Sequence, residues 1–278
     1  MSGAGSRVSF PFRLLWFWWL RVLPGWGLIA AVIFLFQIAI CAIVHDNDNV
    51  KALLAFVQIL PPFVKSMLGG ATLRPDNTAA LISIGYQHPF VLILFMVYAV
   101  GTPTGLLAGE VQRGTMELIL SRRVTKTQVY VCAALPALLG MFALALAMFL
   151  GTVAGTSIYS FEKPVPLDGF FRIAVNGGCM AVAVGAISLF VASINRERGR
   201  AVGWAVAYLV VDYFAHLISG WWPMMKRLGP WTLFYYVNGP KAFLERAWPL
   251  REMLALLCIA AVATAAGWLL WRKRDLPA

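Results

Sequence analysis

The sequence predicts an all-α, polytopic membrane protein, and two observations carry that prediction. Hydrophobic residues make up 60% of the 278 residues, whereas charged residues make up only 13%. A soluble globular protein of this size could not hide so much apolar surface from water. The apolar residues are also gathered into long runs, and a helix needs about 20 such residues to cross the hydrocarbon core.

Six apolar runs predict six transmembrane helices. The runs lie at residues 27–44, 89–108, 129–155, 171–194, 201–219 and 253–271. No polar stretch between them is long enough to form a soluble domain. Residues 1–278 are therefore expected to form a single membrane domain without a nucleotide-binding domain.

An aromatic-rich segment precedes the first run. Residues 10–22 hold several tryptophans between Arg13 and Arg21, and Pro24-Gly25 follow. Tryptophan rings and arginine side chains both favour the headgroup zone, and the Pro-Gly pair allows a sharp bend. These features predict an interfacial helix followed by a break, and the alternative is a simple extension of the first span. No small-residue cleavage site closes the next apolar run, so a cleavable signal is not expected.

The connection between the first two runs, residues 45–88, is the longest in the chain. Its apolar pieces on either side of Pro61-Pro62 are each too short to cross a bilayer. They are expected to lie on or dip into the outer leaflet, and a re-entrant hairpin remains the alternative. A seventh crossing would put the two termini on opposite sides of the membrane.

The distribution of basic residues predicts the orientation. Both termini, residues 109–128 and residues 195–200 are short pieces dense in arginine and lysine, which the positive-inside rule places in the cytosol. Asn47 and Asp168 are then expected outside, in a multi-pass protein of the bacterial cytoplasmic (inner) membrane. The net charge of +11 is accordingly assigned to lipid headgroups, not to nucleic acid. Five basic residues in the outer connections weaken the argument: Lys226, Arg227, Lys241, Arg246 and Arg251.

The charged segment 110–126 lies between the second and third runs and predicts a docking element. A transporter that receives movement from an ATPase needs a short rigid element, with apolar residues to fill a cleft and charges to fix its register. The apolar part is Met116, Leu118, Ile119 and Leu120, and the charges are Glu110, Arg113, Glu117, Arg122, Arg123 and Lys126. Gly114 permits a turn, and the Thr115 hydroxyl is expected to cap the following helix. The alternative is an ordinary loop with snorkelling arginines.

The spacing Glu-x-x-x-Gly-Thr-x-Glu-Leu-x-Leu-Ser-x-x-Val-Thr-Lys in this segment resembles the loop between the second and third spans of ABC type-2 transporter permeases. The family usually has a proline where this chain has Arg123. Residues 60–69, His88-Pro89 and residues 228–240 are similar to the outer loops of NosY-like permeases in the same family. The resemblance thus covers most of the chain, but only segment 110–126 is specific.

The resemblance implies a cytosolic coupling helix in segment 110–126 and an elbow helix at residues 10–22. It also implies two copies of a separate ABC ATPase subunit, a second permease copy, and membrane lipid as the surroundings. ATP and magnesium would bind to the ATPase, and this chain would bind no cofactor. The implied function is that of an exporter-type permease. One alternative is a non-transporting subunit that passes conformational changes of the ATPase to an extracytoplasmic protein. The other is an ATP-independent carrier.

Three polar residues within apolar runs are candidates for a translocation path. Asp212 is an acid inside the fifth run, where an unpaired charge is costly. His216 lies four residues later on the same helix face, and Asn176 lies in the fourth run. The competing interpretation is structural: Asp212 pairs with His216 or lies near the wet outer interface, and Asn176 binds a neighbouring helix.

Signatures of enzymatic chemistry are missing from the sequence. It holds no HExxH, GxSxG or Walker loop, so neither a catalytic residue nor a metal site is expected. The four cysteines, Cys41, Cys132, Cys179 and Cys258, each fall in an apolar run and show no metal-ligand spacing. The pair Met224-Met225 does not by itself indicate copper.

Overall fold

The computed structural model describes residues 10–46, 50, 55, 59, 78–161, 164–237 and 247–275. The regular structure of these residues is entirely helical, with no β-strand among them. Six stretches are long and apolar enough to cross a membrane, which confirms the predicted six-span, all-α architecture. They are α1 (Phe12–His45), α4 (Thr78–Gln87) with α5 (Pro89–Leu106), α8 (Lys126–Ile158), α9 (Leu167–Ile194), α10 (Arg198–Trp221) and α12 (Leu250–Lys273).

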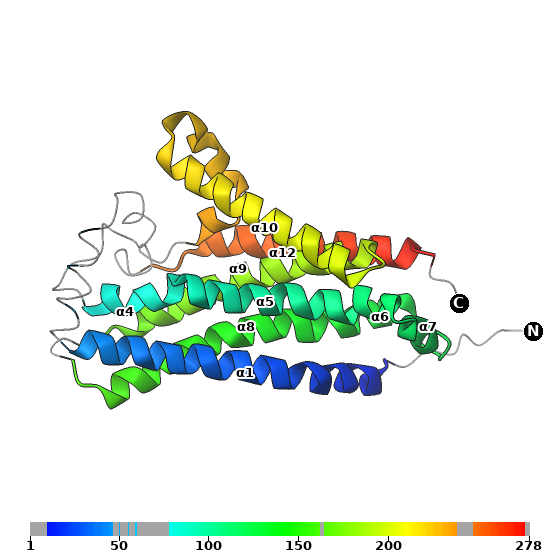
Figure 1. The fold of residues 1–278 in the computed structure, drawn as a ribbon, viewed down its shortest axis with the longest axis horizontal. Coiled ribbons are helices and arrows are strands. Elements are labelled where there is room, and N and C mark those ends of the chain that lie inside the picture. The colour runs from blue at the N-terminus through cyan, green and yellow to red at the C-terminus, as the bar shows by residue number, and fades with distance from the viewer. Residues whose placement is uncertain are drawn as a thin grey trace, which may run out of the picture.

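The helices form one elongated bundle, and its two ends differ (Figure 1). Two short helices, α6 (Ala108–Gln112) and α7 (Thr115–Leu120), lie at the end where α1 begins and α12 finishes. We call this the α7 end. The 3₁₀ helices η1 (Pro223–Trp231) and η2 (Phe234–Tyr236) follow α10 at the opposite end. Helix α10 leans away from the other helices toward that end (Figure 1).

The expected separate interfacial helix at residues 10–22 is not observed, because residues 12–22 belong to the long helix α1. It runs without a break from Phe12 to His45 and includes Pro24. A proline removes one backbone donor, but membrane helices tolerate it where neighbouring helices support the chain. Such support is present on both sides of Pro24. Trp18 is fully buried among the side chains of the α7 end, and the Trp26 indole N–H donates to the carbonyl of Gly140 at 3.0 Å.

Small residues bring α1 and α8 close together. A Cβ atom added to Gly151 would lie 2.6 Å from the carbonyl oxygen of Phe34, and one added to Gly155 would lie 2.7 Å from the Cβ of Cys41. Gly151 and Gly155 are four residues apart and so occupy one face of α8. That face is the surface against which α1 packs.

Helix α4 was missed by the sequence analysis, which placed residues 78–87 in a long connection. It leads into α5 through His88, whose Nδ1 accepts a hydrogen bond from the Phe90 N–H at 3.2 Å. Pro89 fits the first position of α5 because a helix leaves that N–H unpaired in any case. Most of the connection before α4, including Asn47 and Pro61-Pro62, lies outside the described residues.

Candidate functional site

Segment 110–126 folds as two short helices with a tight turn between them. Helix α6 continues the direction of the second span (Figure 1), Arg113 ends it, and Gly114 forms the turn that leads into α7. Gly114 has φ of +71°, in the left-handed region that disfavours a side chain. The predicted turn at Gly114 is therefore confirmed. The segment is not one helix, because this turn separates Glu110 from the residues of α7.

Glu110 is buried, although the sequence analysis counted it among the charges with which the docking element would contact a partner. Only 5% of its side chain is accessible. Its Oε1 accepts a hydrogen bond from the Arg21 guanidinium at 2.5 Å and another from Arg113, while Oε2 accepts one from the Thr115 hydroxyl. One carboxylate thus ties α1, α6 and the start of α7 together. A partner protein cannot reach it without opening this network.

The surroundings of Glu110 favour its charged form. Burial, the largest single effect, raises the pKa of the carboxyl group. Hydrogen bonds from Thr115, Arg113 and Arg21, together with the positive charge of Arg21, outweigh burial and leave the pKa of Glu110 below its ordinary value. The carboxylate is therefore ionised at neutral pH and has three charge-assisted or polar partners.

Thr115 does not cap α7, contrary to the prediction. The N-cap residue is Gly114, without a side-chain cap, and the Thr115 hydroxyl donates to the Glu110 carboxylate and also to the Glu110 carbonyl at 3.1 Å. Capping occurs instead at Thr125, which forms a reciprocal capping box with Gln128 at the start of α8. This cap defines where segment 110–126 ends and α8 begins.

The outer surface of α7 is a small, mixed patch. Leu118 is 69% exposed, and Glu117, Arg122 and Arg123 are exposed around it. Met116 faces the other way and is buried in the cluster that holds Trp18. Ile119 and Leu120 are half-buried against the same cluster. Of the four apolar residues expected to fill a partner's cleft, only Leu118 is therefore well exposed.

Further bonds tie segment 110–126 to the remaining helices. The Gln112 amide oxygen accepts from the Arg198 backbone N–H at 2.8 Å, which joins α6 to the start of α10. Lys126 is half-buried, and its Nζ donates to the Arg274 carbonyl at 2.6 Å. The Lys126 carbonyl accepts from the Trp271 indole N–H at 3.0 Å. These contacts join α8 to the end of α12, so Lys126 belongs to the bundle and not to the exposed patch.

The three intramembrane candidates converge on another feature, the segment 232–236 at the opposite end. Both oxygens of Asp212 accept from the Leu233 backbone N–H, at 3.1 and 3.0 Å. The Asn176 amide donates to the Tyr236 carbonyl at 3.1 Å. His216 lies 3.5 Å from the Thr232 hydroxyl. Among the described residues, Asp212 and His216 form no hydrogen bond or ion pair with one another, so the alternative in which they pair is wrong. Each side chain instead contacts the segment that follows η1.

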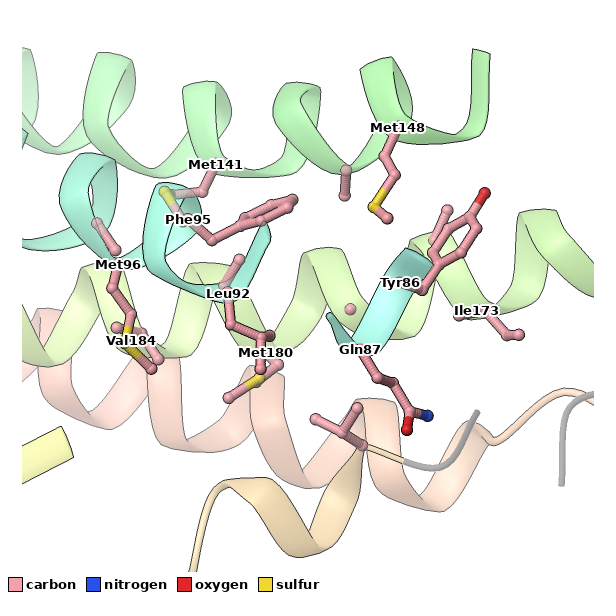
Figure 2. A pocket seen from close by; sticks show the side chains of 16 residues that line it. Tyr86, Gln87, Leu92, Phe95, Met96, Met141, Met148, Ile173, Met180 and Val184 are labelled. Carbon is pink, nitrogen blue, oxygen red and sulfur yellow. The ribbon is translucent and has the colours of Figure 1, made fainter. Parts of the chain in front are cut away.

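The buried pocket among α5, α8 and α9 is apolar and is not lined by any of these three residues. Its volume is about 70 Å³. Figure 2 shows the side chains of Met96, Met141, Met148 and Met180 on these three helices. Tyr86 and Gln87 supply most of its polar groups. Methionines at helical spacing gave no distinctive sequence signal, because the same pattern describes an ordinary core.

Comparisons of the chain with protein-family models, curated proteins and solved structures gave no match.

Proposed function

We propose that this chain is the permease subunit of an ABC transporter of exporter type, driven by a separate ATPase subunit. The observation that carries the proposal is the construction of α6 and α7. An exposed patch around Leu118, with Glu117 and Arg122, lies beside the buried Glu110 carboxylate, whose ion pairs with Arg21 and Arg113 anchor it to the spans. A solvent loop that only joins two spans has no need of such a rigid base.

The anchoring supports a mechanical role for α7. A force applied to the exposed patch would reach α1 through Glu110 and Arg21, which are 2.5 Å apart. It would reach α10 through Gln112 and the Arg198 backbone. Charge-assisted bonds of this kind resist separation better than neutral ones. Displacement of α7 by the ATPase would therefore move α1 and α10 together.

In this proposal the chain neither binds nor hydrolyses ATP. ATP and magnesium belong to the partner ATPase, of which two copies serve two copies of this chain. The α7 end then faces the cytosol of a bacterial inner membrane, and Asp168, at the start of α9, faces outward. In intact cells, a membrane-impermeant thiol reagent should label the Asp168→Cys variant and spare Arg122→Cys. The reverse pattern would contradict the orientation.

Charge reversal on α7 tests the proposed docking. Glu117→Arg and Arg122→Glu should lower co-purification of an ATPase that carries a Walker loop, because a reversed charge places like charges against each other at the interface, which costs several kcal/mol. Both residues are exposed, so melting of the isolated chain should not change. Arg200→Glu is the matched control, since Arg200 is also exposed at the α7 end but pairs with Glu197. Unchanged ATPase capture and unchanged transport in both α7 variants would remove the assignment.

A further inference from the structure

The pocket among α5, α8 and α9 is a space that the packing of the three helices leaves open. Its volume is about 70 Å³, whereas protein interiors hold few voids larger than a water molecule. Gly177 of α9 lines the pocket, and a Cβ atom added there would meet no atom of a neighbouring helix within 4 Å. At the next residue, Gly178, an added Cβ atom would lie 2.9 Å from the Phe142 ring. Helix α9 is therefore closely packed beside the pocket and open only toward it.

The walls of the pocket can change shape. Four of the ten methionines in the chain line it: Met96, Met141, Met148 and Met180 (Figure 2). A methionine side chain is unbranched and flexible, and its polarisable sulfur packs well against apolar and aromatic groups. The pocket can therefore adapt to a molecule larger than its present volume, which a wall of branched side chains would resist.

The chemistry of the lining favours an uncharged occupant. None of the described residues that line the pocket carries a charge. Its polar groups come mainly from Tyr86 and Gln87, and the Tyr86 hydroxyl already forms a hydrogen bond with the Thr152 hydroxyl at 2.6 Å. A water molecule needs several polar partners to be held in a cavity, and an ion would lose its hydration there without a counter-charge.

We propose that this pocket binds an uncharged, apolar molecule with the bulk of about one aromatic ring. An apolar cavity of about 150 Å³ stays dry and takes up benzene, so a modest movement of the methionine side chains would make enough room. That such molecules are the substrate class of the transporter rests on the proposed function. The binding itself requires only this chain.

Photolabelling of the purified full-length chain in nanodiscs tests the binding without an ATPase. The probe is trifluoromethyl phenyl diazirine, an apolar ring that forms a carbene on illumination and attaches to the side chains beside it. Met141, Met148 and Met180 are at most 7% exposed, so probe dissolved in the bilayer does not reach them from outside the bundle. Peptide mass spectrometry should find adducts on these methionines. Toluene should remove the adducts by competition, and benzoate at equal membrane content should not, because its charge has no partner in the pocket.

Filling the pocket should prevent the labelling. Gly177→Leu places a side chain in the open space and should abolish the adducts on the three methionines. Gly177→Ala adds only a methyl group and should reduce them. Alanine favours helix, so Gly177→Ala should not lower the melting temperature, and it decides the question if Gly177→Leu does not fold.

Gly203→Leu is the matched control. Gly203 lies on α10, does not line the pocket, and also has no atom within 4 Å of an added Cβ. This variant should label at the three methionines as the parent chain does. Adducts on Leu254, which is 61% exposed, should be equal in all variants, because they report probe in the bilayer.

Three results would overturn the proposal. The first is an absence of adducts on the buried methionines of the parent chain. The second is equal labelling of these methionines in the parent chain and in both Gly177 variants. The third is displacement of the probe by silver(I) but not by toluene, which would assign the thioethers to a soft metal ion.

This experiment and the charge-reversal experiment on α7 fail independently. A chain that captures the ATPase but takes no label would retain the proposed function and lose this pocket. A chain that takes the label at the three methionines but captures no ATPase would retain the pocket and lose the proposed function.

Discussion

Helices α1 and α8 pack closely against each other, whereas α10 packs loosely against α12. Helices α1 and α8 touch along their length, and Gly151 and Gly155 bring their backbones within reach of each other. Helix α10 makes few contacts with α12 and leaves a groove lined by Trp204 and Tyr208. The side chains at the contact set the spacing, because no hydrophobic force drives helices together within lipid.

The buried carboxylates at the two ends of the bundle also differ in the groups that they bind. At the α7 end, Glu110 of α6 is joined to α1 by an ion pair with Arg21 and to α7 by a hydrogen bond from the Thr115 hydroxyl. At the opposite end, Asp212 holds the segment after η1 through a backbone N–H and no cation. A carboxylate near water can bind exposed arginines, whereas one inside a span must be satisfied by whatever donors the fold supplies. Polar groups thus hold α10 and the segment that follows η1 in place where close packing does not.

The largest expected effect comes from closing the space between α1 and α8. Gly151→Ala would place a Cβ atom 2.6 Å from the Phe34 carbonyl, and overpacking against backbone should cost about 3 kcal/mol, the upper part of the usual range. Gly203→Ala on α10 meets nothing within 4 Å and should be neutral or slightly stabilising, since alanine favours helix. Thermal unfolding in detergent would compare them. Equal melting temperatures would contradict the contrast between close and loose packing.

The Glu110 network should give the next largest effect. Glu110→Gln keeps the volume but removes the charge that Arg21 and Arg113 share, and should cost about 2 kcal/mol, the range for bonds to charged groups. The expected loss of stability is smaller than for a fully buried ion pair because both arginines are more than 40% exposed. Glu197→Gln breaks an exposed pair with Arg200 and should change stability by less than about 0.5 kcal/mol. A similar loss in both variants would contradict the special role of Glu110.

The same network predicts a pH dependence. Because the folded state lowers the pKa of Glu110, its contribution is fully present above the ordinary glutamate pKa of about 4.3. It is lost as the pH falls through the lowered value. The difference in melting temperature between the parent chain and Glu110→Gln should be constant near neutral pH and should shrink below about pH 4. A difference that grows on acidification would refute the sign of the shift.

The smallest effects are expected at Asp212 and its neighbours. Asp212→Ala leaves the Leu233 N–H without an acceptor and should cost about 1–2 kcal/mol, whereas Asp212→Asn keeps an acceptor oxygen and should cost less. His216→Ala removes only a 3.5 Å contact and should change stability by less than about 0.5 kcal/mol. Hydrogen exchange of residues 225–236 would report the loosening. Loss of transport in Asp212→Asn with normal exchange would favour the translocation-path hypothesis instead.

The sequence by itself determined the class and the count of spans. Apolar runs long enough to cross the bilayer leave a chain few alternatives in lipid, since the backbone groups must be hydrogen-bonded within helices. The run that begins at residue 89 predicted α5, and Gly114 predicted the turn before α7, because both signals are local. The length of α1, in contrast, depends on contacts with residues that are distant in the sequence. The predicted break at Pro24 is absent because Trp18 and Trp26 both pack on the bundle.

Tertiary structure alone decided which polar residues are exposed. Glu110 and Glu117 look alike in the sequence, yet one is buried by Arg21, which lies 89 residues earlier, and the other is exposed. Asp212 could not be assigned from its span, because its partner is a backbone N–H 21 residues away. Arg274 resembles any other basic residue at a helix end, and only the carbonyls of Ser193 and Asn195 fix it against the end of α9. Long-range contacts determine these environments, and such contacts cannot be predicted from the periodicity or composition of the sequence.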